Sequence, residues 1–354
     1  MRRISGLDTL ELSALQTAPG MEEWRVRATV RARRIGNDLK VGFLQRGSHR
    51  LVPVHRCMAL VKPLQVAMSK LQEVLSLFKA HEGVFFLELA GSAGDVVVTV
   101  EEIVGVKHVD RCFQQLVEME GSPVVGVGWK AHALKGVDDA QQGMVGRYSV
   151  DAGVALTRCP QAVRDEQVPA AMFRQAHTDM GDVLIERALE MVRGVLQTQD
   201  GESRIVEFFA GCGNFTFPLV ALDGVSSVSA FEGAGDAVRV GRRLAEALEL
   251  DGVEFHVADL FEEKGLAKVS SKVELNAQDI VFLDPPRAGA KELCEWFVQQ
   301  DVYEHIVYVA CDPGTLARDM KVLSEGGWRV ERLEMVDMFP GTAHIESVCV
   351  LKRA

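Results

Sequence analysis

The chain has 354 residues, of which 47% are hydrophobic and 25% charged, and its formal net charge is −11. This length is enough for two domains, each with its own core. No apolar run reaches the roughly 18 residues that would span a bilayer, and the first residues lack the apolar stretch of a secretory signal. The seven cysteines are scattered without a CxxC pair, which argues against a disulfide framework. We therefore expect a cytoplasmic protein.

Residues 1–165 are predicted to form an antiparallel α+β domain. Strand-like segments occupy 24–34, 39–46, 84–91 and 95–106, and a turn at 36–38 joins the first two. Between the two strand pairs, residues 63–83 carry apolar side chains at helical spacing. Residues 126–150 continue in strand and turn style, and no nucleotide-binding fingerprint occurs in this half.

Positive charge is concentrated near the start of this domain. Residues 21–62 hold ten Lys or Arg residues against three acids. Such a segment is compatible with a solvated strand face, and equally with a surface that contacts RNA phosphates. The acidic net charge of the whole chain does not favour a nucleic-acid partner.

Residues 166–354 alternate between strand and helix patterns. An amphipathic helix is predicted at 177–196, followed by strands at 204–210, 227–233, 254–259, 279–286 and 305–313 with helices between them. Two further strands, at 330–339 and 346–353, are expected to pair antiparallel. This alternation predicts a Rossmann-like α/β domain, with a mostly parallel sheet covered by helices on both faces. Ligands of such sheets bind at the carboxyl ends of the strands.

A glycine loop follows the first of these strands and opens a helix. Gly211 and Gly213 allow the backbone to approach a ligand closely, which suits a dinucleotide, S-adenosylmethionine or simply a tight turn. Two acids end the next two strands: Glu232, where a carboxylate can bind ribose hydroxyls, and Asp259, near where an adenine would lie. Together these positions favour an adenosine-type ligand. The third glycine of GxGxxG is replaced by Thr216, which disfavours a nicotinamide cofactor.

Three later segments carry potential chemistry. In the first, Asp284 precedes two prolines that must leave the strand ladder, so Asp284 and Arg287 are presented to the cleft. In the second, Cys311 lies at a strand end just before a helix, where the helix dipole is expected to favour its thiolate. In the third, His344 and Glu346 enter the last strand and would share one of its faces. Taken singly, Cys311 could be a small buried residue and His344 a core histidine.

One reaction needs this combination of groups. Carbon 5 of uracil becomes nucleophilic when a thiolate adds to carbon 6. After carbon 5 has been methylated, a base must remove its proton so that the thiolate can leave. The sequence supplies one cysteine, one carboxylate and a cofactor loop, all at the strand ends of one predicted sheet.

These motifs make the chain resemble the RNA (uracil-5-)-methyltransferases, a class I S-adenosylmethionine-dependent family that makes 5-methyluridine in tRNA and rRNA. The resemblance covers residues 173–354, in the segments FRQ, EFFAGCGNF, FEG, LDPPRAG, YVACDPGTLARD and DMFPGTAHIES. It implies that Cys311 is the nucleophile and Glu346 the base. It also implies that the cofactor is bound by residues at five matching positions: Gln175, Phe209, Asn214, Glu232 and Asp284.

The chain departs from the family pattern in several places. Phe209 stands where Tyr is common, His177 where Asn follows the FxQ segment, and Asp312 where Asn follows the catalytic cysteine. The family's accessory β-barrel domain is not expected, because about 20 residues precede the first strand. Cys57 matches the last ligand of an iron–sulfur cluster found in some members, but no cysteine precedes it. We therefore predict no cluster and no metal site.

Three other interpretations remain open. The enzyme could methylate cytosine carbon 5 or an exocyclic amine, although LDPPRAG lacks both the second cysteine and the aromatic residue typical of those enzymes. The chain could be an RNA-binding or RNA-folding protein that retains the fold. A nicotinamide-dependent oxidoreductase is disfavoured by the missing third glycine. Whether the RNA is tRNA or rRNA, which uridine is methylated, and the oligomeric state are not determined by the sequence.

Overall fold

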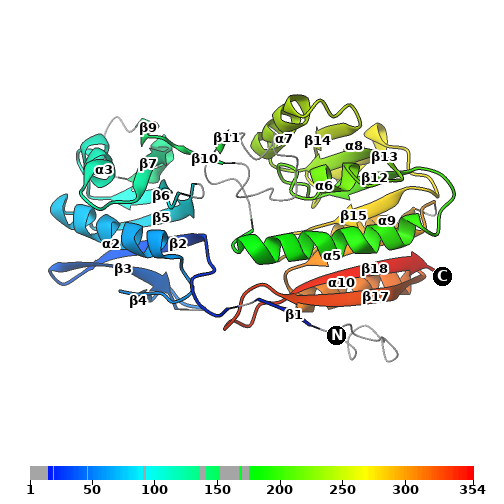
Figure 1. Ribbon diagram of the computed structural model, residues 1–354, viewed down its shortest axis with the longest axis horizontal. Coiled ribbons are helices and arrows are strands. Elements are labelled where there is room, and N and C mark those ends of the chain that lie inside the picture. Colours follow the sequence, from blue (N-terminus) through cyan, green and yellow to red (C-terminus); the bar gives the residue numbers. More distant parts are fainter. Residues whose placement is uncertain are drawn as a thin grey trace. The chain divides into compact units, whose positions relative to one another are not determined.

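The protein is described by a computed structural model that covers residues 15–18, 20–45, 47–90, 93–135, 141–151, 167–169, 175–300 and 302–354. It contains two compact units (Figure 1). The N-terminal unit comprises residues 20–151, 167–169 and 175–178, and the C-terminal unit comprises residues 15–18 and 179–354, except 301. The predicted division between residues 165 and 166 differs from these units at both ends. Most of the predicted boundary region, and Phe173 and Arg174 of the FRQ segment, lie outside the described residues.

Strand pairing explains both differences. The short strand β1 (Gln16–Thr17) pairs with β17 of the C-terminal sheet, Gln16 opposite Val336, so residues 15–18 belong to the C-terminal unit. Ala176 accepts a hydrogen bond from the backbone of Val26 at 2.9 Å, which ties its segment to the N-terminal unit. Neither long-range pairing has a signal in local sequence.

In its described residues, the N-terminal unit is an eight-stranded sheet with two α-helices and one 3-10 helix. Its elements are β2 (Arg27–Ile35), β3 (Asp38–Leu44), β4 (Leu51–Pro53), α2 (Lys62–Leu77), β5 (Glu82–Leu89), β6 (Val96–Val104), α3 (Val109–Glu118), β7 (Val124–Trp129), η1 (Ala131–Ala133), β8 (Leu134–Lys135) and β9 (Gly143–Gly146). A separate pair joins β10 (Ser149–Asp151) to β11 (Gln167–Pro169). The order in the sheet is β4-β3-β2-β5-β6-β7-β9, and β8 also pairs with β6.

The predicted antiparallel arrangement holds from β4 to β6 and again between β7 and β9, but it is wrong for the partners of β6 on its other side. β6 pairs in parallel with β7 and with β8. The reason is the helix α3, which was not predicted from the sequence of this half. It connects β6 to β7 as a crossover, and a strand–helix–strand crossover produces parallel neighbours.

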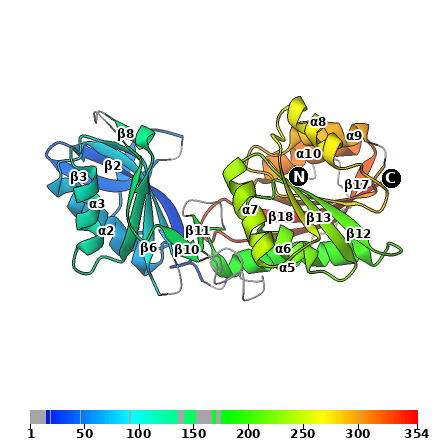
Figure 2. The same ribbon diagram turned by 90° about the horizontal axis from the view of Figure 1, so that it is seen from above.

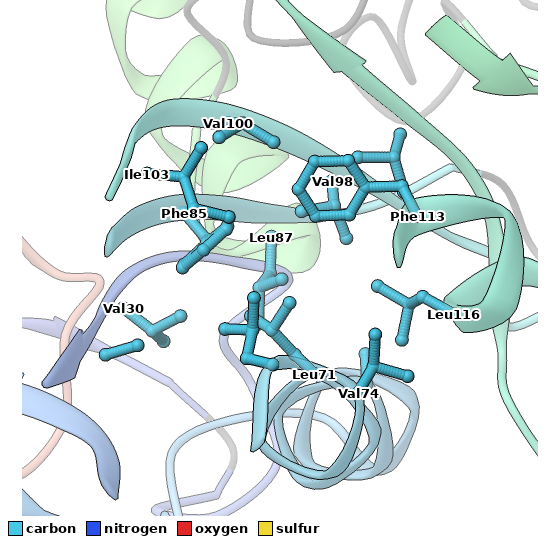
Figure 3. Packing of buried hydrophobic residues seen from close by; sticks show 14 of the residues in the cluster. Val30, Leu71, Val74, Phe85, Leu87, Val98, Val100, Ile103, Phe113 and Leu116 are labelled. Carbon is cyan, nitrogen blue, oxygen red and sulfur yellow. The ribbon is translucent and has the colours of Figure 1, made fainter. Parts of the chain in front are cut away.

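The core of this unit lies between the sheet and its two helices. Alternate residues of the strands, such as Val30, Phe85 and Val98, are fully buried and point toward Leu71 of α2 and Phe113 of α3 (Figure 3). The apolar face of the sheet, formed by every second residue of its strands, therefore packs against the apolar faces of both helices in one core. Cys57 packs at the margin of this core, as expected for a packing residue.

The C-terminal unit alternates strands and helices. Its elements after β1 are α5 (Thr178–Leu196), β12 (Ser203–Phe208), α6 (Thr216–Val220), β13 (Val225–Glu232), α7 (Gly235–Ala247), β14 (Val253–Val257), α8 (Glu263–Lys272), β15 (Ile280–Leu283), α9 (Lys291–Gln299), β16 (His305–Ala310), α10 (Pro313–Glu325), β17 (Trp328–Asp337) and β18 (Glu346–Arg353). The sheet order is β1-β17-β18-β16-β15-β12-β13-β14.

This unit confirms the predicted Rossmann-like α/β fold. β12 to β16 are parallel, and β18 runs antiparallel to both β16 and β17. Neighbouring residues of β12 face opposite layers: Ile205 packs with α5, and Val206 packs with α8, α9 and α10. Figure 2 shows α5, α6 and α7 on one side of the sheet and α8, α9 and α10 on the other.

Among the described residues of both units, none of the helices combines the length and the apolar character that a membrane-spanning segment needs.

The chain reverses its direction of travel across the sheet at β12. From β12 it continues outward to β13 and β14, and it then returns to the other side of β12 with β15 and β16. The point between the carboxyl ends of β12 and β15 is therefore a topological switch point, where open α/β sheets bind ligands. The two ends are joined there by a hydrogen bond of 3.3 Å from the backbone N–H of Asp284 to the carbonyl of Phe208.

Candidate active site

The predicted site residues of the C-terminal unit gather along one edge of its sheet. Parallel pairing brings the carboxyl ends of β12 to β16 to this edge, and the antiparallel β18 begins there. The residues at or just beyond these ends are Phe209, Gly211, Gly213, Asn214, Glu232, Asp259, Asp284, Cys311 and Glu346. The sheet thus unites groups that are up to 137 residues apart in sequence.

The loop after β12 has an unusual backbone. Phe209 has a φ of 63°, in the left-handed region that residues with a side chain seldom adopt. Gly211 and Gly213 follow with φ values of 58° and 112°. A Cβ atom on Gly213 would overlap the ring of Phe217, whereas one on Gly211 would meet no atom within 4 Å. Strained backbone held by its surroundings is common at ligand sites, and the open space above Gly211 allows a ligand to approach the main chain.

Glu232 braces this loop from the neighbouring strand. Its two carboxylate oxygens accept hydrogen bonds from the backbone N–H groups of Gly211, at 3.0 Å, and Ala234, at 2.8 Å. A carboxylate has about four acceptor positions. Glu232 therefore shapes the glycine loop and still has lone pairs available for the hydroxyl groups of a ribose.

Two polar side chains of the same loop have unmet hydrogen-bonding capacity. Both amide atoms of Asn214 are buried and have no partner among the described residues. The same is true of Oε1 of Glu207, whose other oxygen accepts a hydrogen bond of 2.5 Å from the hydroxyl of Thr216. Buried polar groups are nearly always paired, so these atoms point to a polar ligand at the end of β12.

Glu207 was not among the candidates from sequence. Burial, followed by the nearby carboxylates of Asp284 and Glu232, raises its pKa to about 8. The side chain is therefore largely a neutral acid near pH 7, able to accept and donate hydrogen bonds. Nothing in the local sequence shows that Glu207 is buried, so no role was predicted for it.

Asp259 and Phe261 form the next part of the edge. Asp259 is exposed, and its Oδ1 accepts a hydrogen bond of 3.0 Å from the backbone of Phe261. Phe261 is 44% exposed and lies 5.5 Å from Phe209, measured between ring centroids. Sequence reasoning selected Asp259 but missed Phe261, because the partner that makes its ring part of the site is 52 positions away.

Cys311 and Glu346 meet through strand register. β16 and β18 pair antiparallel with Ala310 opposite Ser347, and Cys311 and Glu346 are the next residues at this end of the two strands. The Glu346 carboxyl group acts on the pKa of the Cys311 thiol, so the two side chains are near each other. Glu346 is 4% exposed and Cys311 is half-buried. A thiol and a carboxyl group therefore share one spot at the sheet edge.

The electrostatics of this spot differ from the sequence expectation. Burial, then the carboxyl groups of Glu346 and Asp284, raise the pKa of the Cys311 thiol to about 11, while Arg287 acts to lower it. The predicted preference for the thiolate is thus wrong for this chain. The prediction considered the helix that follows Cys311 but not the burial of the thiol or the two acids that the sheet brings close to it.

The two acids are shifted as well. Burial raises the pKa of Glu346 to about 7, and Arg287 opposes this shift. Burial, with a smaller contribution from Glu346, holds the pKa of Asp284 well above its usual range. Strong perturbation of several titratable groups at one edge is typical of an active site.

The remaining residues of these motifs lie around this centre. Asp312 caps α10, its Oδ1 accepting from the backbone of Gly314 at 2.8 Å and Thr315 at 3.0 Å. His344 is not a core residue: it precedes β18, and its Nε2 lies 3.4 Å from Nη2 of Arg287. Cys212, within the glycine loop, is buried, as a packing residue would be.

Gln175 belongs to the N-terminal unit. Its neighbour His177 is 5% exposed and stacks on Trp24 with 5.6 Å between ring centroids. The segment is therefore anchored in the N-terminal unit, and the role of Gln175 in binding the cofactor stays a prediction.

Comparisons with known proteins agree with this chemistry. The profile of the tRNA (Uracil-5-)-methyltransferases matches residues 161–354. The 23S rRNA (uracil(1939)-C(5))-methyltransferase RlmD of Hahella chejuensis is 29% identical over 342 residues, which cover 94% of this chain and 71% of the relative. The RlmD protein of Aeromonas hydrophila is 30% identical over 327 residues, covering 92% and 68%.

Solved structures show more distant similarity. The magnesium protoporphyrin IX methyltransferase of Synechocystis, with bound SAH, has 15% identity and a TM-score of 0.36 over 49% of this chain and 83% of its own.

The fold and the edge residues define a methyltransferase with a Rossmann-like catalytic unit. The chain belongs to the tRNA (Uracil-5-)-methyltransferase family. The expected family, enzyme class and cofactor are thereby confirmed: the protein is an S-adenosylmethionine-dependent RNA methyltransferase.

Proposed function

We propose that the protein methylates carbon 5 of a uridine in ribosomal RNA, with Cys311 as the nucleophile and Glu346 as the base. The observation that supports this proposal is the register of β16 and β18: Ala310 lies opposite Ser347, and Cys311 and Glu346 are the next residues at that end of the two strands. The choice of ribosomal RNA is supported by the relatives, which are named as 23S rRNA uracil methyltransferases and are aligned over more than 90% of this chain. An RNA substrate also agrees with the expected cytoplasmic location.

The residues at the strand ends fit the cofactor. Asn214, whose amide is unpartnered, and the open backbone at Gly211 would face its polar parts. Glu232 and Asp259 would bind the ribose and the adenine, and Phe261 would stack on the adenine ring. When bound, S-adenosylmethionine supplies the methyl group as an electrophile.

The chain's own groups perform the remaining steps. The Cys311 thiol first releases its proton to water. Its Sγ then bonds to carbon 6, and the electrons of the 5,6 double bond move toward carbon 5 and the neighbouring carbonyl. Arg287 favours this attack because its positive charge lowers the pKa of the thiol. Once carbon 5 carries the methyl group, Glu346 takes the proton from that carbon. The electron pair left behind restores the double bond and expels the thiolate.

A mechanism-based trap tests this assignment. RNA in which uridine is replaced by 5-fluorouridine has no proton to lose at carbon 5, so the reaction should stop with the protein bonded to carbon 6. We expect a covalent complex on a denaturing gel with 23S rRNA, with no such complex for Cys311→Ala. Cys212→Ala is the matched control, because this second cysteine of the sheet edge should leave trapping intact. No complex despite bound cofactor would overturn the proposal, and trapping of tRNA alone would move the substrate to tRNA.

The face of β2 that is turned away from the core is our proposed RNA-contacting surface. Arg31 and Arg33 alternate with buried residues along this strand. Arg34 does not belong to the surface: its guanidinium donates to the carbonyls of Ala80 and Asn37, at 2.8–3.2 Å. Of the three closely spaced arginines at the end of β2, the proposed surface therefore includes Arg31 and Arg33.

Charge reversal tests this surface. Arg31→Glu with Arg33→Glu should weaken RNA binding and reduce its salt dependence, by a slope of about one for each lost phosphate contact. The control reverses two exposed cations on or beside α3, Lys107 and Arg111, which keeps the change in net charge the same. Equal effects of the two double variants would mean that RNA responds only to overall charge.

A further inference from the structure

A buried carboxylate is hydrogen-bonded to segments that carry or adjoin the proposed active-site residues. Asp319, on α10, is 0% exposed. Its Oδ2 accepts hydrogen bonds from the backbone N–H of Ala290 and from the hydroxyl of Tyr308, both at 2.7 Å. Its Oδ1 accepts from Nε of Arg318 at 2.8 Å. The Asp319 carboxylate therefore accepts hydrogen bonds from the loop that ends at Ala290, from β16 and from its own helix α10.

Each of these segments carries or adjoins a reactive group. Tyr308 belongs to β16, which ends just before Cys311. Asp319 belongs to α10, which begins just after that cysteine. Ala290 ends the loop 284–290, which starts at Asp284 and contains Arg287. A single side chain thus fixes the loop relative to the nucleophile.

The loop is held closely at a second point. Nη2 of Arg318 donates to the carbonyl of Ala288 at 2.8 Å. Gly289 lies between the two tied residues with a φ of 77°, and a Cβ atom there would come within 2.5 Å of both Arg318 Nη2 and Asp319 Oδ2. Only glycine fits this backbone conformation and this spacing without strain.

We propose that Asp319 is a positioning residue that holds the 284–290 loop so that Arg287 faces Cys311 and Glu346. This inference rests on the proposed roles of those two residues. Asp319 itself touches neither substrate nor cofactor in this scheme. It acts through Arg287, the cation that lowers the pKa of both the thiol and the carboxyl group.

Three variants separate this role from simple structural support. Asp319→Ala removes the bond from Ala290 to the carboxylate and the contact that orients Arg318 toward the loop. Gly289→Ala pushes the loop away while leaving the carboxylate in place. Tyr308→Phe is the matched control, because it also deletes a buried hydrogen bond to Asp319 but leaves the bond to Ala290. All three are expected to lower the melting temperature, and only the first two should displace Arg287.

The readout is alkylation of Cys311 by iodoacetamide, followed by mass spectrometry of its peptide, without RNA or cofactor. Since one pKa unit changes the thiolate fraction tenfold, we expect alkylation at pH 8 to be about 3- to 10-fold slower in Asp319→Ala and Gly289→Ala. Tyr308→Phe should react at the wild-type rate. Binding of S-adenosylhomocysteine, measured by calorimetry, should be unchanged in all three, because the glycine loop follows β12 and Asp284, at the start of the 284–290 loop, stays bonded to the carbonyl of Phe208.

Equal slowing in Tyr308→Phe, or wild-type rates in the other two variants, would overturn the proposal. The assay does not depend on turnover. If 5-fluorouridine trapping failed while the alkylation pattern appeared, the proposed function would be wrong and the positioning role would stand.

Discussion

Replacing the proposed base should make the protein more stable at alkaline pH. Glu346 is 4% exposed, and its pKa is raised from 4.5 to about 7, mainly by burial. In the unfolded chain the same carboxyl group would titrate near its ordinary value. Above pH 7 folding therefore has to bury a carboxylate, and Glu346→Gln removes that cost while keeping the size of the side chain.

The sign follows from proton linkage. Between pH 4.5 and 7 the folded state binds more protons than the unfolded state, so stability falls as pH rises through this window. The stability that the protonated Glu346 side chain contributes, relative to the buried carboxylate, is fully present below about pH 4.5 and is lost above pH 7. A shift from 4.5 to about 7, at about 1.4 kcal/mol per unit, sets an upper bound of about 3 kcal/mol on the gain.

Urea unfolding of wild type and Glu346→Gln at pH 4.5 and pH 8 measures this gain. The variant should be more stable at pH 8, nearly equal at pH 4.5, and inactive at both. Glu331→Gln, an exposed position on β17, is the control and should show no pH-dependent gain. A variant that is less stable than wild type at pH 8 would refute the reasoning, because Glu346 would then be held by favourable contacts as a carboxylate.

Three further outcomes can be checked. The turnover rate should rise roughly tenfold between pH 6 and pH 8 as Glu346 loses its proton; a flat profile would exclude this group as the base. Gly213→Ala should cost about 1–3 kcal/mol in urea unfolding and weaken binding of S-adenosylhomocysteine, because the new methyl group overlaps the ring of Phe217. Phe261→Ala should weaken the same binding by about 1 kcal/mol with little change in unfolding, since the ring is 44% exposed; equal affinity would remove Phe261 from the adenine site.

Local patterns in the sequence predicted the elements of the site well. A strand followed by glycines, by an acid or by prolines is a local event, and the strands of the C-terminal unit were expected within a few residues of where they lie. The convergence of their ends also follows from sequence, because parallel strands joined by helices must end at one edge.

Other features depended on long-range packing. The raised pKa of Cys311 comes first from burial and then from the carboxyl groups of Glu346 and Asp284, whereas the helix that follows in the sequence suggested a lowered pKa. Two features of the topology also depended on long-range packing. The helix α3 made β6 and β7 parallel, and β1 joined the sheet beside β17. None of these has a local signal, because each depends on which distant segment becomes a neighbour.

The sequence by itself determined the alternation of strands and helices, the motifs at the strand ends and the family to which they belong. Hydrophobic periodicity and turn chemistry act over a few residues, so they can be read along the chain. Only the tertiary structure decided which groups face Cys311, how deeply Glu346 is buried, and that Asp319 ties the 284–290 loop to α10. Desolvation and charge–charge interaction act across space, and folding alone sets those distances.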